Sequence, residues 1–133
     1  MGCDIHGWVE HCHEGKWVAT SEFTDLACAR NYERFNLLAR VRGEEGDPAG
    51  IKARGIPANV SDTVCYHIQS WGEDGHSHSW LRLSKALPIF MQTEHREPDQ
   101  AKWGESYALW RYFGVEREGL TGSDWRIVFW FDN

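Results

Sequence analysis

One ten-residue stretch, from Trp71 to Trp80, holds three side chains that could bind a metal ion. Asp74, His76 and His78 alternate in it with small residues. Side chains of an extended backbone repeat every second residue, so this spacing predicts that all three side chains point to one side of the chain. Neutral imidazoles and carboxylates are common ligands of zinc, manganese and iron, and three protein ligands leave one coordination position open for water. The alternative is a polar, solvated loop in which the small residues only form turns.

A second group of candidate ligands, Asp4 and His6, lies in the N-terminal region. An Asp-x-His pair in a strand places both side chains on one face, so the pair could complete the site or hold a second metal ion. Two metal ions can stabilise both the attacking and the leaving oxygen of a phosphoester. The predicted ligands of zinc, manganese or iron are therefore Asp4, His6, Asp74, His76 and His78. The alternative for the N-terminal pair is a polar strand face at the surface.

Candidate residues for catalysis and substrate binding accompany these ligands. Glu73 or Glu10 could act as the general base for a metal-bound water. Tryptophan rings can stack on a nucleobase, and arginine side chains can bind a phosphate bidentately. The candidate substrate-binding residues are Trp71, Trp80, Arg40, Arg42 and Arg54. The alternative is that the tryptophans fill the core and that the arginines form ordinary surface charge.

Length, composition and charge narrow the class of protein. The chain has 133 residues, with 41% hydrophobic and 26% charged residues, which is typical of one soluble globular domain covering residues 1–133. No apolar run approaches the roughly 20 residues of a membrane-spanning helix. The N-terminus lacks a signal-peptide pattern, which favours a cytoplasmic location. The irregular spacing of the four cysteines predicts free thiols.

The net charge of −6 argues against a protein that binds duplex nucleic acid by neutralising phosphates. A small anionic ligand, with a nucleotide as the best candidate, is compatible with this charge if a metal ion supplies the positive charge. No membrane partner is expected, and the sequence does not indicate an oligomeric state.

Hydrophobic periodicity and turn residues predict the elements that position these side chains. Strands are predicted at residues 4–10, 16–19 and 125–131, with the first two joined in a hairpin through Gly15. A helical face runs from Asp25 to Val41, and a second helix begins at Ser61 and ends at Gly72.

The rest of the chain is predicted to contain one long loop and two further helical segments. Residues 42–59 contain too many glycines and prolines for regular structure, and their length suggests a binding loop or lid. A short helical segment opening at Ser84 should be limited by Pro88. An aromatic stripe at helical spacing consists of Trp103, Tyr107, Trp110 and Phe113.

Four separated motifs in the chain resemble one protein family. They are Met1-Gly-Cys-Asp-Ile-His6, Arg30-Asn-Tyr32 with Phe35, the stretch Trp71–Trp80, and Val128-Phe-Trp-Phe-Asp-Asn133. Together they resemble a group of small bacteriophage and prophage proteins, and the resemblance spans most of the chain. It brings no activity, fold or catalytic residue with it. It implies a context in which small phage proteins modify nucleotides or counter host immunity, in some cases by binding or cleaving cyclic nucleotide signals.

These observations lead to one expected fold and to competing functions. We predict a single α+β domain, with a small mixed or antiparallel sheet that includes both terminal strands and has two or three helices packed on it. Adjacent terminal strands would bring Asp132 near Asp4. The predicted function is metal-dependent hydrolysis of a nucleotide phosphodiester, in which metal-bound water attacks phosphorus, in the context of phage counter-defence against a cyclic nucleotide. The alternatives are a noncatalytic sponge that holds a nucleotide between tryptophans and arginines, and an interaction protein that blocks a host factor.

Overall fold

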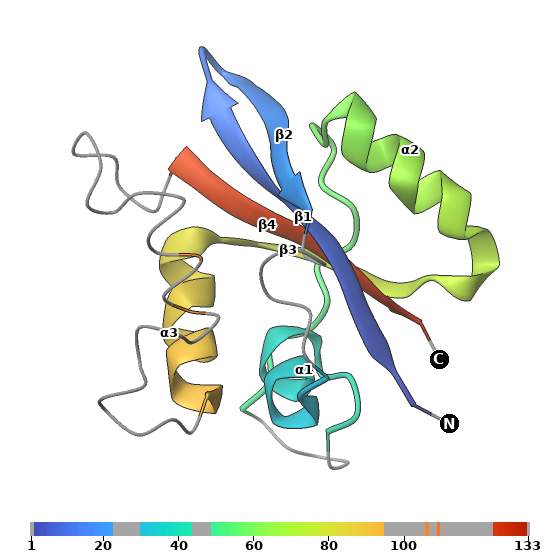
Figure 1. The fold of residues 1–133 in the computed structure, drawn as a ribbon, viewed down its shortest axis with the longest axis vertical. Coiled ribbons are helices and arrows are strands. Elements are labelled where there is room, and N and C mark those ends of the chain that lie inside the picture. The colour runs from blue at the N-terminus through green and yellow to red at the C-terminus, as the bar shows by residue number, and fades with distance from the viewer. Residues whose placement is uncertain are drawn as a thin grey trace.

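A computed structural model of the protein describes residues 2–22, 30–43, 49–94, 106, 109 and 124–132. The predicted aromatic stripe, the first residues of the expected helix from Asp25 and the middle of the loop at 42–59 lie outside the described residues. Within the described part, one antiparallel sheet has helices on both of its faces (Figure 1). The predicted α+β architecture with both terminal strands in the sheet is therefore confirmed.

The four strands of the sheet lie in the order β2-β1-β4-β3. Their bounds are β1 Asp4–His13, β2 Lys16–Glu22, β3 His76–Arg82 and β4 Trp125–Asp132. The N-terminal and C-terminal strands, β1 and β4, are the two central strands, and every neighbouring pair is antiparallel. Asp4 pairs with Asp132 in this register, as the sequence predicts. The hairpin between β1 and β2 turns through Glu14 and Gly15, both with positive φ.

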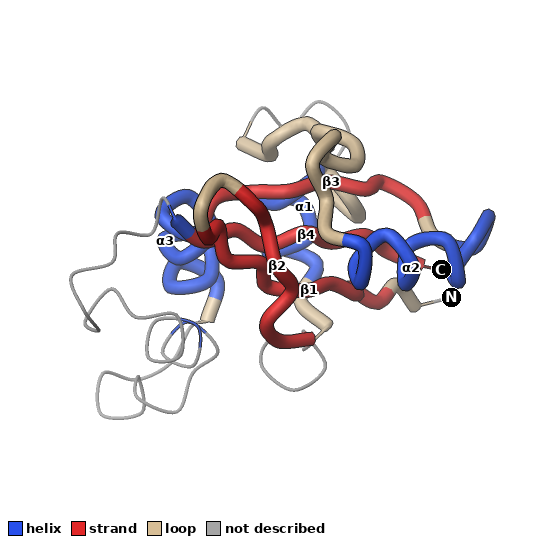
Figure 2. The backbone as a smooth tube through the Cα atoms, turned by 90° about the horizontal axis from the view of Figure 1, so that it is seen from above, coloured by secondary structure: helices blue, strands red, loops and turns tan. Residues whose placement is uncertain are grey.

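The helices cover the two faces of the sheet unequally. Helices α1 (Tyr32–Ala39) and α3 (Leu83–Thr93) lie on one face, and α2 (Asp62–Trp71) lies on the other (Figures 1 and 2). Alternate side chains of β4 point to opposite faces of the sheet. The larger core, on the side of α1 and α3, takes Phe129 and Phe131, and the smaller core under α2 takes Val128 and Trp130.

Local side chains set the ends of the helices. Asn31 caps α1 by accepting a hydrogen bond from the backbone N–H of Arg34 at 3.0 Å. Ser61 caps α2 in the same way at Val64, and Gly72, with φ +55°, ends that helix. Both predicted boundaries of α2 are confirmed. A short 3-10 helix, Gly72–Asp74, then leads directly toward β3.

Helix α3 continues past Pro88, contrary to the prediction that this proline limits it. A proline inside a helix removes the hydrogen bond to the carbonyl four residues earlier, which here belongs to Ser84. Ser84 and Pro88 both lie on the exposed side of the helix, so water can hydrate that carbonyl. The opposite side of α3 is anchored in the larger core by Leu87 and Phe90, which outweighs the lost bond.

Within the described residues, no helix is both long enough and apolar enough to cross a membrane.

Candidate functional site

Two groups of side chains on the α2 side of the sheet contain some of the candidate residues. The first, which we name the histidine cluster, consists of His6, Trp71, His78, Trp130 and Asp132. The second, which we name the arginine–tryptophan pocket, is lined by Trp17, Arg54, Ile56, Pro57, Ala58, Asn59, Trp80, Arg82 and Arg126.

His6 is the best-defined member of the histidine cluster. Its Nε2 lies 2.9 Å from Oδ1 of Asp132, on the neighbouring strand β4. Its ring lies against the indole of Trp71, the last residue of α2, with 4.1 Å between ring centroids. The side chains of His6 and Asp132 are 21% and 30% exposed, so solvent reaches this pair. The arrangement can hold or transfer a proton at His6.

His78 lies on the other side of Trp130 and is held neutral. Burial, and secondarily the nearby charge of His76 when protonated, lowers the pKa of His78 from its usual value of 6.5. Its Nε2 is buried and meets no hydrogen-bond partner among the described residues. A neutral imidazole with a free ring nitrogen is the form that ligates a metal ion.

The expectation that Asp74, His76 and His78 share one side of an extended strand is wrong. Asp74 lies in the exposed 3-10 helix before the strand. The pairing of β3 with β4 is irregular between His76 and Ser79, and Ser77 has φ +54° within this irregularity. As a result, His76 stacks near Phe131 and His78 near Trp130, two successive residues of β4 that face opposite sides of the sheet.

The two predicted groups of metal ligands reach the same strand from opposite sides. His6 pairs with Trp130, and His76 pairs with Phe131, so β4 lies between them. Strands two positions apart in a sheet are separated by roughly 10 Å. Asp4 is bound by Arg30 through two hydrogen bonds of 2.9 and 3.0 Å. Among residues 2–22, 30–43, 49–94, 106, 109 and 124–132, no group of three or more His, Cys, Asp or Glu side chains is arranged to hold a metal ion.

The two predicted general bases lie in contrasting environments. Glu73 is exposed in the 3-10 helix. Glu10 is completely buried and accepts hydrogen bonds from Nε of Arg126 at 2.7 Å and from the backbone N–H of Ser61 at 2.8 Å. A carboxylate with these fixed partners positions β4 and the start of α2, so its geometry favours a structural role.

The arginine–tryptophan pocket has a volume of about 500 Å³ and combines cations with aromatic rings. The guanidinium carbon of Arg126 lies 4.0 Å from the centroid of Trp17 and 5.9 Å from that of Trp80. Arg54 lies over Trp80 at 5.1 Å, and Arg82 lies near Trp17 at 5.8 Å. All four distances lie within the roughly 6 Å that is usual for cation–π contacts.

Arg126 forms the fixed floor of the pocket, whereas Arg54 and Arg82 are exposed. Besides Glu10, Arg126 binds the side-chain oxygen of Asn59 at 2.8 Å and its carbonyl oxygen at 3.3 Å. The backbone N–H of Arg54 donates to the hydroxyl of Ser79 at 3.0 Å, which attaches the 49–60 loop to β3. The described end of the loop predicted at residues 42–59 therefore lines this pocket, and its binding role stays a prediction.

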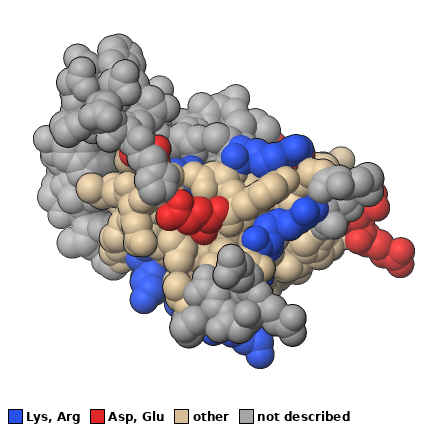
Figure 3. Space-filling view, turned by 90° about the horizontal axis from the view of Figure 1, so that it is seen from below, with Lys and Arg blue, Asp and Glu red and all other residues tan. Residues whose placement is uncertain are grey.

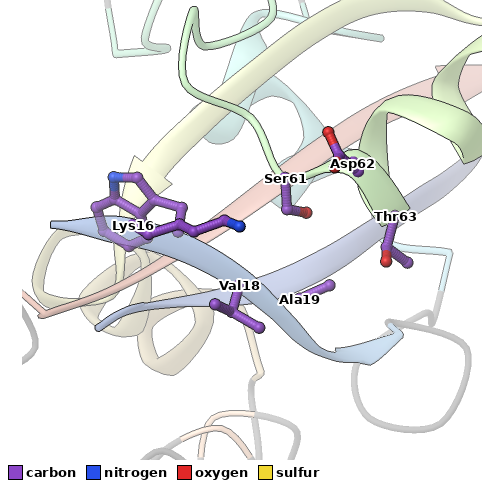
Figure 4. Close-up of a pocket in the computed structure, with 7 residues that line it drawn as sticks. Lys16, Val18, Ala19, Ser61, Asp62 and Thr63 are labelled. Atoms are coloured by element: carbon purple, nitrogen blue, oxygen red, sulfur yellow. The ribbon is translucent and has the colours of Figure 1, made fainter. Parts of the chain in front are cut away.

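A smaller pocket of about 200 Å³ adjoins the arginine–tryptophan pocket and shares Trp17 with it. Its walls come from β2 and from the first residues of α2 (Figure 4). Lys16, Val18 and Ala19 of β2 line one side of it, and Ser61, Asp62 and Thr63 line the other.

The structure brings only some of the predicted substrate-binding residues together. Trp80 and Arg54 line the arginine–tryptophan pocket. Trp71 instead packs on His6. Arg40 adopts a left-handed conformation after α1 and donates to the carbonyl of Gly50 at 2.8 Å. Arg42 lies over the ring of Tyr32, away from the pocket-lining residues.

Sequence reasoning missed Trp17, Arg82 and Arg126 as pocket residues. A signal for Arg126 was present, because it is a charged residue in an otherwise apolar strand, and such a residue needs a buried partner. The alternation of β1 places Glu10 on its polar face as that partner. No local pattern identifies Trp17 or Arg82, because their proximity depends on the pairing of all four strands.

Charge on the rest of the surface is interspersed where it can be seen. On the face shown in Figure 3, basic side chains lie in separate groups, with uncharged and acidic side chains between them.

Comparison of the chain with protein-family models, with curated proteins and with solved structures found no match in any of the three.

Proposed function

We propose that the protein captures a small anionic nucleotide in the arginine–tryptophan pocket. The observation that carries this proposal is the convergence of two indoles and three guanidinium groups on one cavity of about 500 Å³. This volume lies within the usual range of small-molecule sites, about 300 to 1,000 Å³. Tryptophan and arginine are the side chains that bind the two halves of a nucleotide, its aromatic base and its phosphate.

The three arginines of the pocket have different roles, because one is fixed and buried and the other two are exposed. Arg126 is neutralised by Glu10 and locked by Asn59, so it supplies a rigid polar floor. Arg54 and Arg82 lie at the exposed positions and supply the charge that a phosphate requires. A base that stacked on Trp80 in place of the Arg54 guanidinium would contribute roughly 1 to 3 kcal/mol.

The separation of the two regions supports capture over cleavage at this pocket. Arg126 and Asp132 are six residues apart in β4, which corresponds to roughly 20 Å of extended strand. A mononucleotide in the pocket therefore does not reach the His6–Asp132 pair. The described residues that line the pocket include no carboxylate and no imidazole that could act as a general base.

Ligand release combined with point variants tests this proposal. The purified protein is denatured, and the released small molecules are identified by mass spectrometry; titration calorimetry then measures the affinity for the nucleotide found. Trp80→Ala and Arg54→Ala should each weaken binding by about tenfold or more, given the usual energies of base stacking and of charged hydrogen bonds. Arg42→Ala is the matched control, because it removes an arginine that lies outside the pocket. Equal affinities for all four proteins would refute nucleotide binding at this pocket.

A metal-dependent phosphodiesterase centred on the histidine cluster is our second proposal. It is favoured by the neutral His78 with its unpartnered Nε2 and by the His6–Asp132 pair on the same face. His78 would be the metal ligand, because His6 lies across β4 from it, and zinc, manganese or iron held by His78 would supply an activated water. Untagged protein should then contain near-stoichiometric metal that His78→Ala loses, while His13→Ala, which changes an exposed turn histidine, retains it.

The two proposals and the remaining alternative predict different products. A released intact nucleotide supports capture, and a cleaved one supports hydrolysis. The phage context would supply a cyclic nucleotide signal as the ligand in either case. A protein that blocks a host factor would contain neither ligand nor metal and would show neither activity.

A further inference from the structure

The arginine–tryptophan pocket and the smaller pocket beside it share one residue and are lined by one continuous stretch of chain. Trp17 lines both of them. The opposite wall is a continuous piece of chain, in which residues 56–59 face the larger pocket and residues 61–63 face the smaller one. Their volumes, about 500 and about 200 Å³, together still fall within the range of one small-molecule site.

We propose that the ligand is a dinucleotide, with one nucleotide in the arginine–tryptophan pocket and the nucleoside part of the second in the smaller pocket. This inference rests on the proposed function, because it assumes that the larger pocket holds a nucleotide. It adds a ligand class and a second subsite.

The chemistry of the smaller pocket fits a nucleoside better than a phosphate. Asp62 lines it, and a carboxylate repels a phosphate but accepts hydrogen bonds from ribose hydroxyls or from an amino group of a base. The hydroxyls of Ser61 and Thr63 add further hydrogen-bonding groups, although Ser61 also caps α2. Trp17 supplies an aromatic wall, and Lys16, which also lines the pocket, adds an aliphatic chain.

Each pocket contributes a cation near Trp17, the residue that both pockets share. Arg82 lies near the ring of Trp17 from the larger pocket, and Lys16, the residue before Trp17, belongs to the smaller one. A phosphodiester beside Trp17 would therefore meet positive charge from both pockets. A mononucleotide would leave the smaller pocket without a ligand group.

Titration calorimetry with adenine and guanine ligands tests the inference. AMP and GMP are compared with the linear dinucleotides ApA and GpG and with their cyclic dinucleotide counterparts. For at least one base, a dinucleotide should bind about tenfold or more tightly than the mononucleotide, as expected from one more stacked base. If mononucleotides bind as tightly as every dinucleotide, the inference is overturned while the proposed function stands. If no ligand binds, both are overturned.

Two variants then locate the second nucleoside. Lys16→Ala should reduce dinucleotide affinity by up to about fivefold and leave mononucleotide affinity unchanged, as expected for the loss of one exposed ion pair. Lys85→Ala, which removes an exposed lysine on α3, is the matched control and should change neither. Asp62→Asn should also weaken dinucleotide binding, because the carboxylate is a better acceptor than the amide. Tighter dinucleotide binding by Asp62→Asn would show that a phosphate occupies the smaller pocket and would overturn the placement.

Discussion

The buried ion pair between Glu10 and Arg126 should dominate the response of the fold to a single charge removal. Both Arg126 Nε and Nη2 contact Oε1 of Glu10, at 2.7 and 2.6 Å, and the two side chains are 3% and 0% exposed. The other carboxylate oxygen accepts a hydrogen bond from the backbone N–H of Ser61. In Glu10→Gln, the new amide NH₂ group must therefore face a donor, either the guanidinium or the Ser61 N–H. The variant loses one acceptor and leaves the charge of Arg126 buried without its counter-charge.

The structure indicates the size of this effect. Breaking a buried ion pair by removing one partner costs about 3 to 5 kcal/mol. A domain of this kind has a total unfolding free energy of about 5 to 15 kcal/mol, so Glu10→Gln should consume a large fraction of it. The exposed pair between Asp4 and Arg30 provides a matched comparison, because its side chains are 47% and 50% exposed. Asp4→Asn should cost only about 0.2 to 1 kcal/mol.

Urea unfolding followed by tryptophan fluorescence measures both costs. Trp17 lies on Arg126 and reports on the region directly. The double variant Glu10→Leu with Arg126→Met removes both charges and should recover most of the lost stability, since apolar replacement of a whole buried pair is often neutral. The reasoning is refuted if Glu10→Gln and Asp4→Asn shift the unfolding free energy equally at equal m-values.

Three further predictions concern other parts of the fold. In metal-free buffer, stability should fall as the pH drops below about 6.5, because His78 is protonated more readily in the unfolded state than in the folded state. Thermal melts of His78→Phe should lose this part of the pH dependence, and an unchanged profile would contradict the burial of this imidazole. Gly7→Ala should lower the unfolding free energy by about 1 to 3 kcal/mol in chemical denaturation, because a Cβ there would lie 2.6 Å from the carbonyl oxygen of Val128. A neutral result would show that β1 and β4 can separate locally. Ser61→Ala should cost about 1 kcal/mol through loss of the α2 cap, measured in the same way, and no loss would mean that water replaces the hydroxyl.

The strands β1, β2 and β4 and the ends of α2 could be predicted from sequence because their signals are local. Alternation separated Ile5 and Val9 from His6 and Glu10 on β1, and the two sets do face different layers. Ser61 and Gly72 carry the chemistry of a helix start and a helix end within a few residues of chain. These features depend on neighbours in the sequence, so periodicity and capping rules suffice for them.

The candidate site was less predictable because its geometry depends on distant pairing. The alternation of Asp74, His76 and His78 predicts a common face only for an uninterrupted strand. The 3-10 helix before β3 and the irregular pairing near Ser77 interrupt the strand. Serine rarely adopts a positive φ, so the sequence does not predict the conformation of Ser77. The arginine–tryptophan pocket needs β2, β3 and β4 in register, which no sequence window contains.

The position of β4 between β1 and β3 also has a consequence for how the chain acquires its structure. His6 and Asp132 touch although they are 126 residues apart, and closing a loop of that length costs about 4 kcal/mol of chain entropy beyond a constant term. During synthesis, the inner edges of β1 and β3 would remain unpaired until the segment from Trp125 leaves the ribosome, because that segment is the strand that joins them. Such non-local sheets fold slowly and expose strand edges to aggregation in the interval, so yield in the cell should depend on chaperones and temperature more than native stability alone implies.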